Sequence, residues 1–297
     1  MVLTGLDYLR ENQISPDEVK GLLCSLWETV FGDEPDYIRI FLDSPAFRLE
    51  DTVVSLDGGK LAAMLFLLPV GLRGMNGRYV YAVATHPDFR QRGHAGKMLE
   101  FAQHLTEQRG EDFTCLHPAS SSLYGFYQRF GFETTFYIHE AVRKQGKRDF
   151  YRFQIMNSPE WKFRSLYLET VSKRQEQFLR WNEEMLPFIY QEAKAQNGGA
   201  LSINGAGVCL YTCPEGDTVF VKELAFPGGI PGGVLDELAA FWHGKEVIFR
   251  LPVDFSEKNE KKPVLQPFGM VKYRKGLLCP ALDMPGLSHA FMGIALD

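Results

Sequence analysis

The stretch from Arg78 to Phe132 limits what this chain can fold into more than any other part of the sequence. It begins with an apolar run, Tyr79 to Ala84, that is typical of a buried strand, and Pro87 ends that strand because proline cannot donate to a β-ladder. The sequence RQRGHAGK follows at Arg90 to Lys97 and leads directly into an amphipathic segment that we expect to be helical. A strand, a glycine-containing loop and a helix start, in this order, predict a backbone site for an anion.

The chemistry of the loop favours a phosphate or pyrophosphate ligand. Gly93 and Gly96 allow a close backbone approach, and the first N–H groups of the helix have no intrahelical partner. Arg90, Arg92 and Lys97 add positive charge; in an ordinary helix start, the alternative interpretation, these cations would oppose the dipole. The chain has no GxxxxGK followed by Ser or Thr and no GxGxxG with a later acidic residue, so neither a Walker loop nor a dinucleotide-binding fold is expected.

Two motifs in this stretch resemble the signatures of the GNAT N-acyltransferases. The first is Arg-x-x-Gly-x-Ala at residues 90–95, after a strand that ends in Thr-His-Pro, and the second is Tyr127-Gln-Arg-Phe-Gly131-Phe132. The resemblance covers residues 1–145 directly and implies that acetyl-CoA is the co-substrate. The residues that it places at the acyl-CoA are Val83, Ala84, Thr85, Arg90, Gln91, Arg92, Gly93, His94, Ala95, Gly96, Lys97, Ser121 and Ser122.

The same resemblance assigns Tyr127 as the general acid that protonates the departing CoA thiolate. A tyrosine with a pKa of about 10 can donate to a thiolate with a pKa of about 8.5. The aromatic residues around Tyr127 also allow it to be a core residue. Many GNAT enzymes use a Glu on the central strand as the base, but Tyr79 to Thr85 contains no carboxylate. The bases that stay open are His86, His117, Glu133, Asp297 and a water relay.

The order of elements around the stretch fits the GNAT layout. Ser15-Pro16-Asp17-Glu18 is a capping box that predicts a helix ending at Gly32. A helical crossover joins the Tyr79 strand to the strand at Phe113–Leu116, so the two should run parallel, and in this superfamily they splay apart to admit the acyl-CoA arm. The other elements expected here are a helix over 35–42, hairpin strands over 51–56 and 60–69, helices over 93–109 and 120–130, and a strand over 132–142.

Residues 166–297 repeat the order of elements expected in the first half: helix, hairpin, strand, Pro/Gly loop, helix and strand. The second loop, Pro227 to Gly233, has no Arg or Lys, and Leu265 stands where the first copy has Tyr127. We therefore predict an α+β (mixed α/β) chain of two tandem GNAT-like folds, each a mixed, mostly antiparallel sheet flanked by helices, with a degenerate second copy. The arrangement is similar to the enhanced-intracellular-survival type. The predicted domain ranges are a catalytic domain over 1–145, a linker over 146–165 and the second domain over 166–297. Within the second domain we expect a helical region over 166–195, strands over 200–204, 208–212 and 218–225, a helix over 234–242, and strands over 247–251 and 271–278.

The composition of the chain limits the kinds of binding partner and the cellular location that we expect. The 297 residues carry a net charge of −5, with 45% hydrophobic and 23% charged residues, which indicates a globular chain and argues against nucleic acid as the main partner. The five cysteines lack zinc spacing and we expect them to be reduced, and no metal site is predicted. We expect neither a signal peptide nor a membrane span, because the longest apolar stretch is short and contains Pro69. These features favour a cytoplasmic protein and leave oligomerisation open.

The sequence thus predicts an acetyl-CoA-dependent N-acetyltransferase in which a primary amine, on a small molecule or a protein, attacks the thioester directly. The alternative is a non-catalytic acyl-CoA-binding or scaffolding protein. Tyr127 favours the enzyme, and the missing strand carboxylate favours the alternative. Nothing in the sequence identifies the amine.

Overall fold

The computed structural model describes residues 1–144, 152–171, 178–253, 255, 264–277 and 290–296. The chain forms two compact units, which are described separately below. The first consists of Met1–Thr134, Gly269–Asp283 and Leu296–Asp297, and the second of Thr135–Phe268 and Met284–Ala295. Cys279 and Asp297, which entered the predictions, lie outside the described residues.

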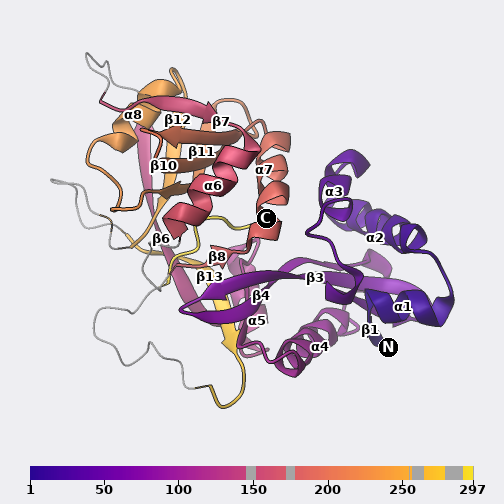
Figure 1. Ribbon diagram of the computed structural model, residues 1–297. Helices are drawn as coiled ribbons and strands as arrows, with labels where there is room; N and C mark the ends of the chain where they lie inside the picture. The colour runs from indigo at the N-terminus through magenta and orange to yellow at the C-terminus, as the bar shows by residue number, and fades with distance from the viewer. Residues whose placement is uncertain (145–151, 172–177, 254, 256–263, 278–289, 297) are drawn as a thin grey trace. The chain divides into compact units, whose positions relative to one another are not determined.

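The first unit has a mixed sheet in the order β1-β2-β3-β4-β5-β13. Figure 1 labels β1, β3, β4 and β13 of these strands. All neighbours are antiparallel except β4 and β5, which are parallel as the helical crossover predicts. The strands are β1 (Val2–Thr4), β2 (Thr52–Asp57), β3 (Lys60–Leu72), β4 (Met75–Thr85), β5 (Phe113–Leu116) and β13 (Gln266–Tyr273). The helices are α1 (Gly5–Asn12), α2 (Pro16–Phe31), α3 (Pro35–Leu42), α4 (His94–Gln108) and α5 (Tyr124–Gln128), with 3-10 turns η1 (Leu49–Asp51), η2 (Pro87–Phe89) and η3 (Ser121–Leu123).

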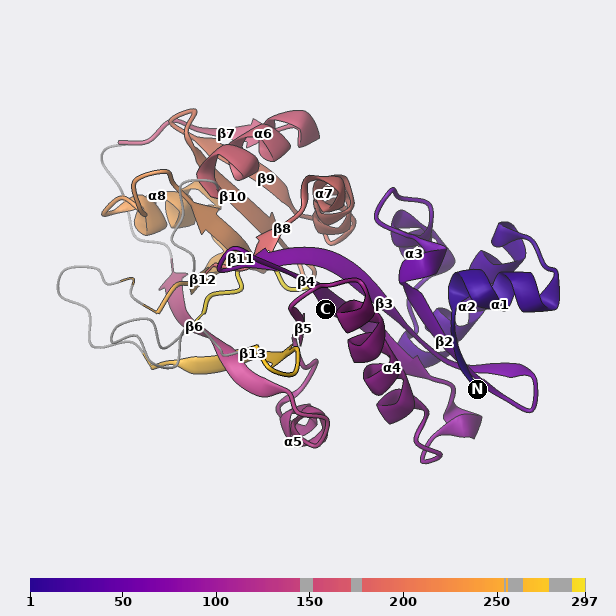
Figure 2. The same cartoon turned by 60° about the horizontal axis from the view of Figure 1, so that its bottom comes forward.

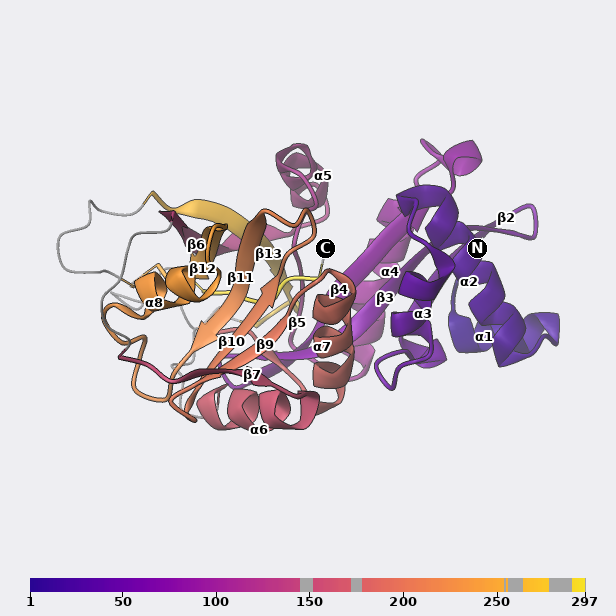
Figure 3. The same ribbon diagram turned by 90° about the horizontal axis from the view of Figure 1, so that it is seen from above.

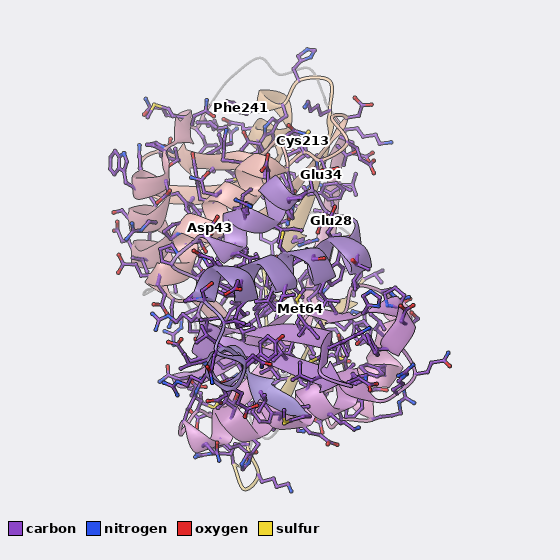
Figure 4. The ribbon with its side chains drawn as sticks, turned by 90° about the vertical axis from the view of Figure 1, so that its right-hand side faces the viewer. Glu28, Glu34, Asp43, Met64, Cys213 and Phe241 are labelled. Atoms are coloured by element: carbon purple, nitrogen blue, oxygen red, sulfur yellow. The ribbon has the colours of Figure 1, made fainter. Side chains whose placement is uncertain are left out.

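Helices cover both faces of this sheet. The helix α4 packs through Met98 and Leu99 on alternate residues of the strands, among them Leu65 and Val80. Trp27 of α2 packs on the opposite face, with its ring centroid 5.8 Å from that of Phe66. Figure 2 shows α4 and the α2–α3 pair on opposite sides of β3, and Figure 4 shows α2, marked by Glu28, lying over Met64 of β3.

The predicted start of α2 is confirmed in detail. The Ser15 side chain accepts from the backbone N–H of Glu18, the Glu18 carboxylate accepts from the backbone N–H of Ser15, and Pro16 is the first helical residue. Gly32, in the left-handed conformation with φ of 79°, closes the helix as expected. The helix therefore has both ends set by the local sequence.

The second unit has its own mixed sheet, in the order β6-β12-β11-β10-β9-β7. Only β11 and β12 are parallel within it. Figure 3 shows α8 on one side of these strands and α6 and α7 on the other. The elements are β6 (Glu133–Lys144), β7 (Ile155–Ser158), α6 (Glu160–Val171), β8 (Arg180–Trp181), η4 (Glu183–Met185), α7 (Leu186–Ala195), β9 (Gly199–Ile203), β10 (Gly207–Thr212), β11 (Thr218–Ala225), α8 (Val234–Phe241) and β12 (Glu246–Leu251).

Two details repeat between the units and confirm the predicted α+β class with mixed, mostly antiparallel sheets. Each unit has one parallel strand pair joined by a helical crossover, β4–β5 and β11–β12. Each also has a register shift in the hairpin before that pair, between Met64 and Phe66 on β3 and between Leu210 and Tyr211 on β10. A bulge at equivalent places bends the central strand of both copies.

The second half departs from the predicted pattern at one helix. The helical region predicted over 166–195 is wrong as a single element: α6 already ends at Val171, β8 follows at Arg180–Trp181, and α7 starts at Leu186. Pro187, in the first turn of α7, marks this new start. In addition, β7 and the start of α6 occupy the later part of the range predicted as linker.

The last strands of the two copies are exchanged. β13, near the C-terminal end of the chain, pairs with β5 of the first unit, where Met270–Tyr273 lie opposite Leu116–Phe113. β6, which follows the first copy in sequence, pairs with β12 of the second unit. Each exchange satisfies a strand edge that would otherwise expose its N–H and C=O groups.

Candidate functional site

The site begins where β4 separates from β5. The parallel pairing covers only Gly77–Tyr79 opposite Phe113–Cys115, whereas β4 continues to Thr85. Ala82, in this continuation, has a φ of +48°, which is uncommon for a residue with a side chain. The bulge against β3 at this point turns the strand, so the backbone of residues 80–85 extends beyond the paired part of β5.

The loop after β4 presents free backbone donors. Gln91 and Gly93 are both left-handed, with φ of +62° and +79°, and Gly93 is the N-cap of α4. The first helical bond runs from the N–H of Lys97 to the carbonyl of Gly93. Within the described part of the chain, the N–H groups of residues 91–96 have no acceptor. Six consecutive free donors at the positive end of a helix dipole can hold an anion.

These donors border an open depression of about 730 Å³ in the first unit. Of the predicted cofactor residues, eight line it: Thr85, Arg90, Gln91, Gly93, His94, Ala95, Gly96 and Lys97. The wall also includes Phe89, Glu100, Phe126, Arg129 and Phe130, which the sequence reasoning did not single out. Three cations and one carboxylate therefore surround the depression, and its charge favours an anion.

Gly96 was expected to allow a close backbone approach to a ligand, but in the structure it makes room for the ring of Phe130. A Cβ at this position would lie 2.6 Å from Cζ of Phe130, so only glycine lets the first turn of α4 touch that ring. Around Gly93, by contrast, no atom of the described residues lies within 4 Å of the position that a Cβ would take. The open space is therefore at Gly93, beside the free N–H groups.

Arg92, which does not line the depression, points toward Asp57, the last residue of β2, and the ring of His94 reaches the same residue from the wall of the depression. The Arg92 Nη1 lies 3.0 Å from Asp57 Oδ2, and the His94 Nε2 lies 3.4 Å from the same oxygen. The hydrogen bond from Arg92 is the main reason why the pKa of the Asp57 carboxyl is lowered. Arg92 thus has a charge partner on the protein, which leaves Arg90, Lys97 and Arg129 to face a ligand.

Tyr127 lies on α5 and is 7% exposed, packed with Phe132 and Met270 in the core of the first unit. Burial raises the pKa of Tyr127 to about 12. Among the described residues its hydroxyl has no hydrogen-bond partner, and Tyr127 is not part of the wall of the depression. The structure therefore gives Tyr127 a core position and leaves its hydroxyl available as a donor.

The other predicted residues lie around the site without lining the depression. Ser121 and Ser122 are exposed in the turn before α5, with the Ser122 hydroxyl 2.8 Å from that of Ser120. Val83 and Ala84 belong to the splayed end of β4. His86, His117 and Glu133, the candidate bases, are not among the lining residues.

The equivalent helix start in the second unit is built differently. Gly233, with φ of +81°, is the N-cap of α8 just as Gly93 is the N-cap of α4. The first turn of α8, however, carries Asp236 and Glu237, whereas the first turn of α4 carries no acidic residue. The Glu237 carboxylate accepts the backbone N–H groups of Arg152 and Phe153 at 2.9 Å. Acidic side chains in the first turn thus offset the positive end of this helix dipole and disfavour an anionic ligand there.

No group of three or more His, Cys, Asp or Glu side chains that could hold a metal ion occurs in the described ranges. In the same ranges, every helix falls short of the length and hydrophobicity that a bilayer crossing requires.

A family model matches the first part of the chain. Residues 13–135 match the model described as Acetyltransferase (GNAT) domain, which confirms the resemblance that the two motifs predict for this region. No curated protein matches the chain.

Solved structures share the fold over most of the chain. A GCN5-related N-acetyltransferase from Kribbella flavida is 15% identical, with a TM-score of 0.62 over 91% of this chain and 70% of its own. Eis1 from Mycobacterium abscessus is 11% identical, with a TM-score of 0.63 over 87% and 72%. A tandem GNAT protein from the clavulanic acid biosynthesis pathway is 12% identical, with a TM-score of 0.50 over 86% and 95%. At these identities the likeness concerns the fold, and it agrees with the tandem arrangement that the sequence predicts.

Proposed function

We propose that the first unit binds acetyl-CoA and transfers its acetyl group to a primary amine, in the cytoplasm. The observation that carries this proposal is the row of free N–H groups at residues 91–96, next to the point where β4 leaves β5. The donors, the open space at Gly93 and the cations Arg90 and Lys97 fit a pyrophosphate group. The splayed end of β4 would then lie along the acyl-bearing arm.

The proposed mechanism is direct attack of the amine on the thioester. A backbone N–H of the splayed segment, residues 80–85, would polarise the thioester carbonyl and stabilise the oxyanion that forms. The loop and α4 would fix the cofactor end of the substrate, so the reacting atoms meet in one orientation. Tyr127 would donate a proton to the departing thiolate. The group that accepts the proton of the amine stays open among the residues named above and water.

We further propose that the second unit does not bind CoA. Its loop lacks cations, and Asp236 and Glu237 compensate the start of α8. Gly293, of the C-terminal segment, packs on β11 just beyond its last pair with β12, so that a Cβ there would lie 3.0 Å from the Lys222 carbonyl oxygen. Both features oppose entry of an acyl-CoA at that place.

Two measurements test the proposal. Calorimetry with CoA should show binding to the intact chain. Thiol release from acetyl-CoA should then be followed across a panel of polyamines, aminoglycosides, amino acids and a lysine peptide, with the enzyme omitted as background. Absence of CoA binding would refute the assigned site, and the amine with the highest rate would define the acceptor class.

The alternative function, a non-catalytic acyl-CoA-binding protein, is favoured by the burial of Tyr127. With a pKa of about 12 for Tyr127 and about 8.5 for a thiol, full proton transfer is uphill by about 5 kcal/mol. β4 also offers no carboxylate as a base. CoA binding without thiol release for any amine of the panel would support this alternative.

A further inference from the structure

The side chain of His94 connects the proposed phosphate loop to β2. His94 is the first residue of α4, and it is only 6% exposed although it belongs to a loop whose other residues are mostly exposed. Its Nδ1 lies 2.9 Å from the hydroxyl of Ser55, which is itself 1% exposed. Two buried polar groups that are far apart in the sequence thus satisfy each other.

The surroundings of the ring indicate its tautomer. Nε2 faces the Asp57 carboxylate at 3.4 Å, an electrostatic contact without a hydrogen bond, and the negative charge favours a proton on this nitrogen. Nδ1 then accepts from the hydroxyl of Ser55. Phe89 covers the ring edge, with the ring centroids 6.3 Å apart. Ser55, Asp57 and Phe89 together hold the imidazole in one orientation.

His94 also works together with Arg92. The two residues flank Gly93, and both reach the same carboxylate, that of Asp57. Gly93 adopts the left-handed conformation between these two anchors, and Gln91 beside them is left-handed as well. This conformation costs little for Gly93 but is costly for Gln91, which carries a side chain, unless the surroundings fix it. The anchors fix it in the conformation that directs the N–H groups of residues 91–96 outward.

We propose that His94 is a positioning residue for pyrophosphate recognition: through Ser55 and Asp57 it locks the loop of residues 91–96 in the conformation that binds the CoA pyrophosphate. The inference rests on the proposed function, because it assumes that CoA binds at this loop. Preorganisation of donors reduces the ordering cost of binding, so its loss should appear in CoA affinity. It should not appear in the affinity for a ligand without the pyrophosphate.

The test compares His94→Leu and His94→Gln with the parent protein. CoA affinity is measured by calorimetry, and binding of S-acetylpantetheine, which lacks the pyrophosphate, by ligand-observed NMR. His104→Leu is the matched control, because His104 is an exposed histidine on the same helix. We expect His94→Leu to weaken CoA about tenfold, or about 1.4 kcal/mol, with S-acetylpantetheine binding within twofold of the parent. Gln, which can still donate and accept, should recover most of the affinity.

A double-mutant cycle with Ser55→Ala completes the test. If the Ser55–His94 contact carries the effect, the double variant should bind CoA no more weakly than His94→Leu alone. The proposal is overturned if His94→Leu binds CoA like the parent, or if both ligands weaken equally, which would give His94 a general structural role. A parent protein that fails to bind CoA would overturn the proposed function and this inference together. If the parent binds CoA and His94→Leu weakens CoA and S-acetylpantetheine equally, only the inference is overturned.

Discussion

The hydroxyl of Tyr79 donates a hydrogen bond of 3.0 Å to the backbone carbonyl oxygen of Leu296, 217 residues further along the chain. Tyr79 is the last residue of β4 that pairs with β5 and is 1% exposed. The bond therefore fixes the C-terminal end of the described chain at the point where the two strands of the first unit separate. This contact joins the tail to the site that we propose for the acyl group.

Tyr79→Phe should lower the free energy of unfolding by about 1–3 kcal/mol, because it leaves the buried Leu296 carbonyl without its donor. Denaturant unfolding followed by fluorescence measures the loss. Tyr8→Phe is the matched control: Tyr8 is buried in the same unit, and its hydroxyl has no partner among the described residues. Equal effects of the two changes would show that the bond to Leu296 contributes nothing specific.

Gly93→Val should abolish CoA binding, because the side chain would fill the open space beside the free N–H groups and because φ is +79° there. Strain alone must be separated from this effect. Gly110, at the other end of α4, has a φ of +75° and equally open surroundings. Gly110→Val should therefore destabilise the chain to a similar extent while CoA affinity, measured by calorimetry, stays within a few-fold of the parent. Full CoA binding by Gly93→Val would place the site elsewhere.

Local sequence signals predicted the parts of the fold that depend on neighbouring residues. The capping box at Ser15 set the start of α2, and the crossover rule gave the parallel pair β4–β5. Glycine and charge at residues 90–97 pointed to the wall of the depression, where eight of the predicted residues meet. In each case the determining groups lie within one element, one loop or one strand–helix–strand unit that is continuous in the sequence.

Features that join distant segments had no such signal. The exchange of β6 and β13 depends on which strand edges are left open. The sequence pattern of a strand shows that it is a strand, but it does not specify which of the two sheets it joins. From the sequence, Arg92 was predicted to bind phosphate. In the structure its guanidinium forms an ion pair with Asp57, which lies on an earlier hairpin of the chain. Phe130 reaches the depression because Gly96 leaves room for its ring, and Arg129, the residue before it, also lines the wall.

Titration of the intact chain with CoA should give one binding site per chain. The physical reason is that α4 begins with free donors and no acidic residue, whereas α8 begins with Asp236 and Glu237. Calorimetry at a protein concentration well above the dissociation constant gives the stoichiometry. A value near two would refute the proposal that the second unit is silent, and Gly93→Val should then retain one site.

Arg78→Met should lower the free energy of unfolding by about 3 kcal/mol or more, the usual cost of removing one partner from a buried ion pair. The Arg78 side chain, 14% exposed, lies 2.7 Å from Glu111 and 3.1 Å from Asp51. Asp51 keeps Arg109 at 2.6 Å, so Glu111 is the carboxylate that loses its partner. Arg10→Met is the control: Arg10 is exposed and 3.9 Å from Asp7, and its loss should cost less than about 1 kcal/mol. Chemical unfolding of both variants decides.

Tyr127→Phe should reduce turnover by a factor of about 10² to 10⁴, the usual contribution of positioned proton transfer, if Tyr127 is the general acid. The change removes the hydroxyl and keeps the ring, which packs with Phe126 and Phe132 at centroid distances of 5.2 and 5.9 Å. Acetyl-CoA affinity should stay within a few-fold and the melting temperature near that of the parent.

The raised pKa of Tyr127 adds a pH criterion. A group with a folded pKa of about 12 keeps its proton throughout the neutral and mildly alkaline range. Its ionisation should therefore contribute no loss of turnover below about pH 11. Because the hydroxyl ionises first in the unfolded chain, with a pKa of about 10, the free energy of unfolding should fall as the pH rises from about 10 to about 12. Thiol release is measured for parent and variant across this range. Full turnover in Tyr127→Phe would show that the thiolate leaves without this donor, and a loss that follows unfolding would make Tyr127 a core residue.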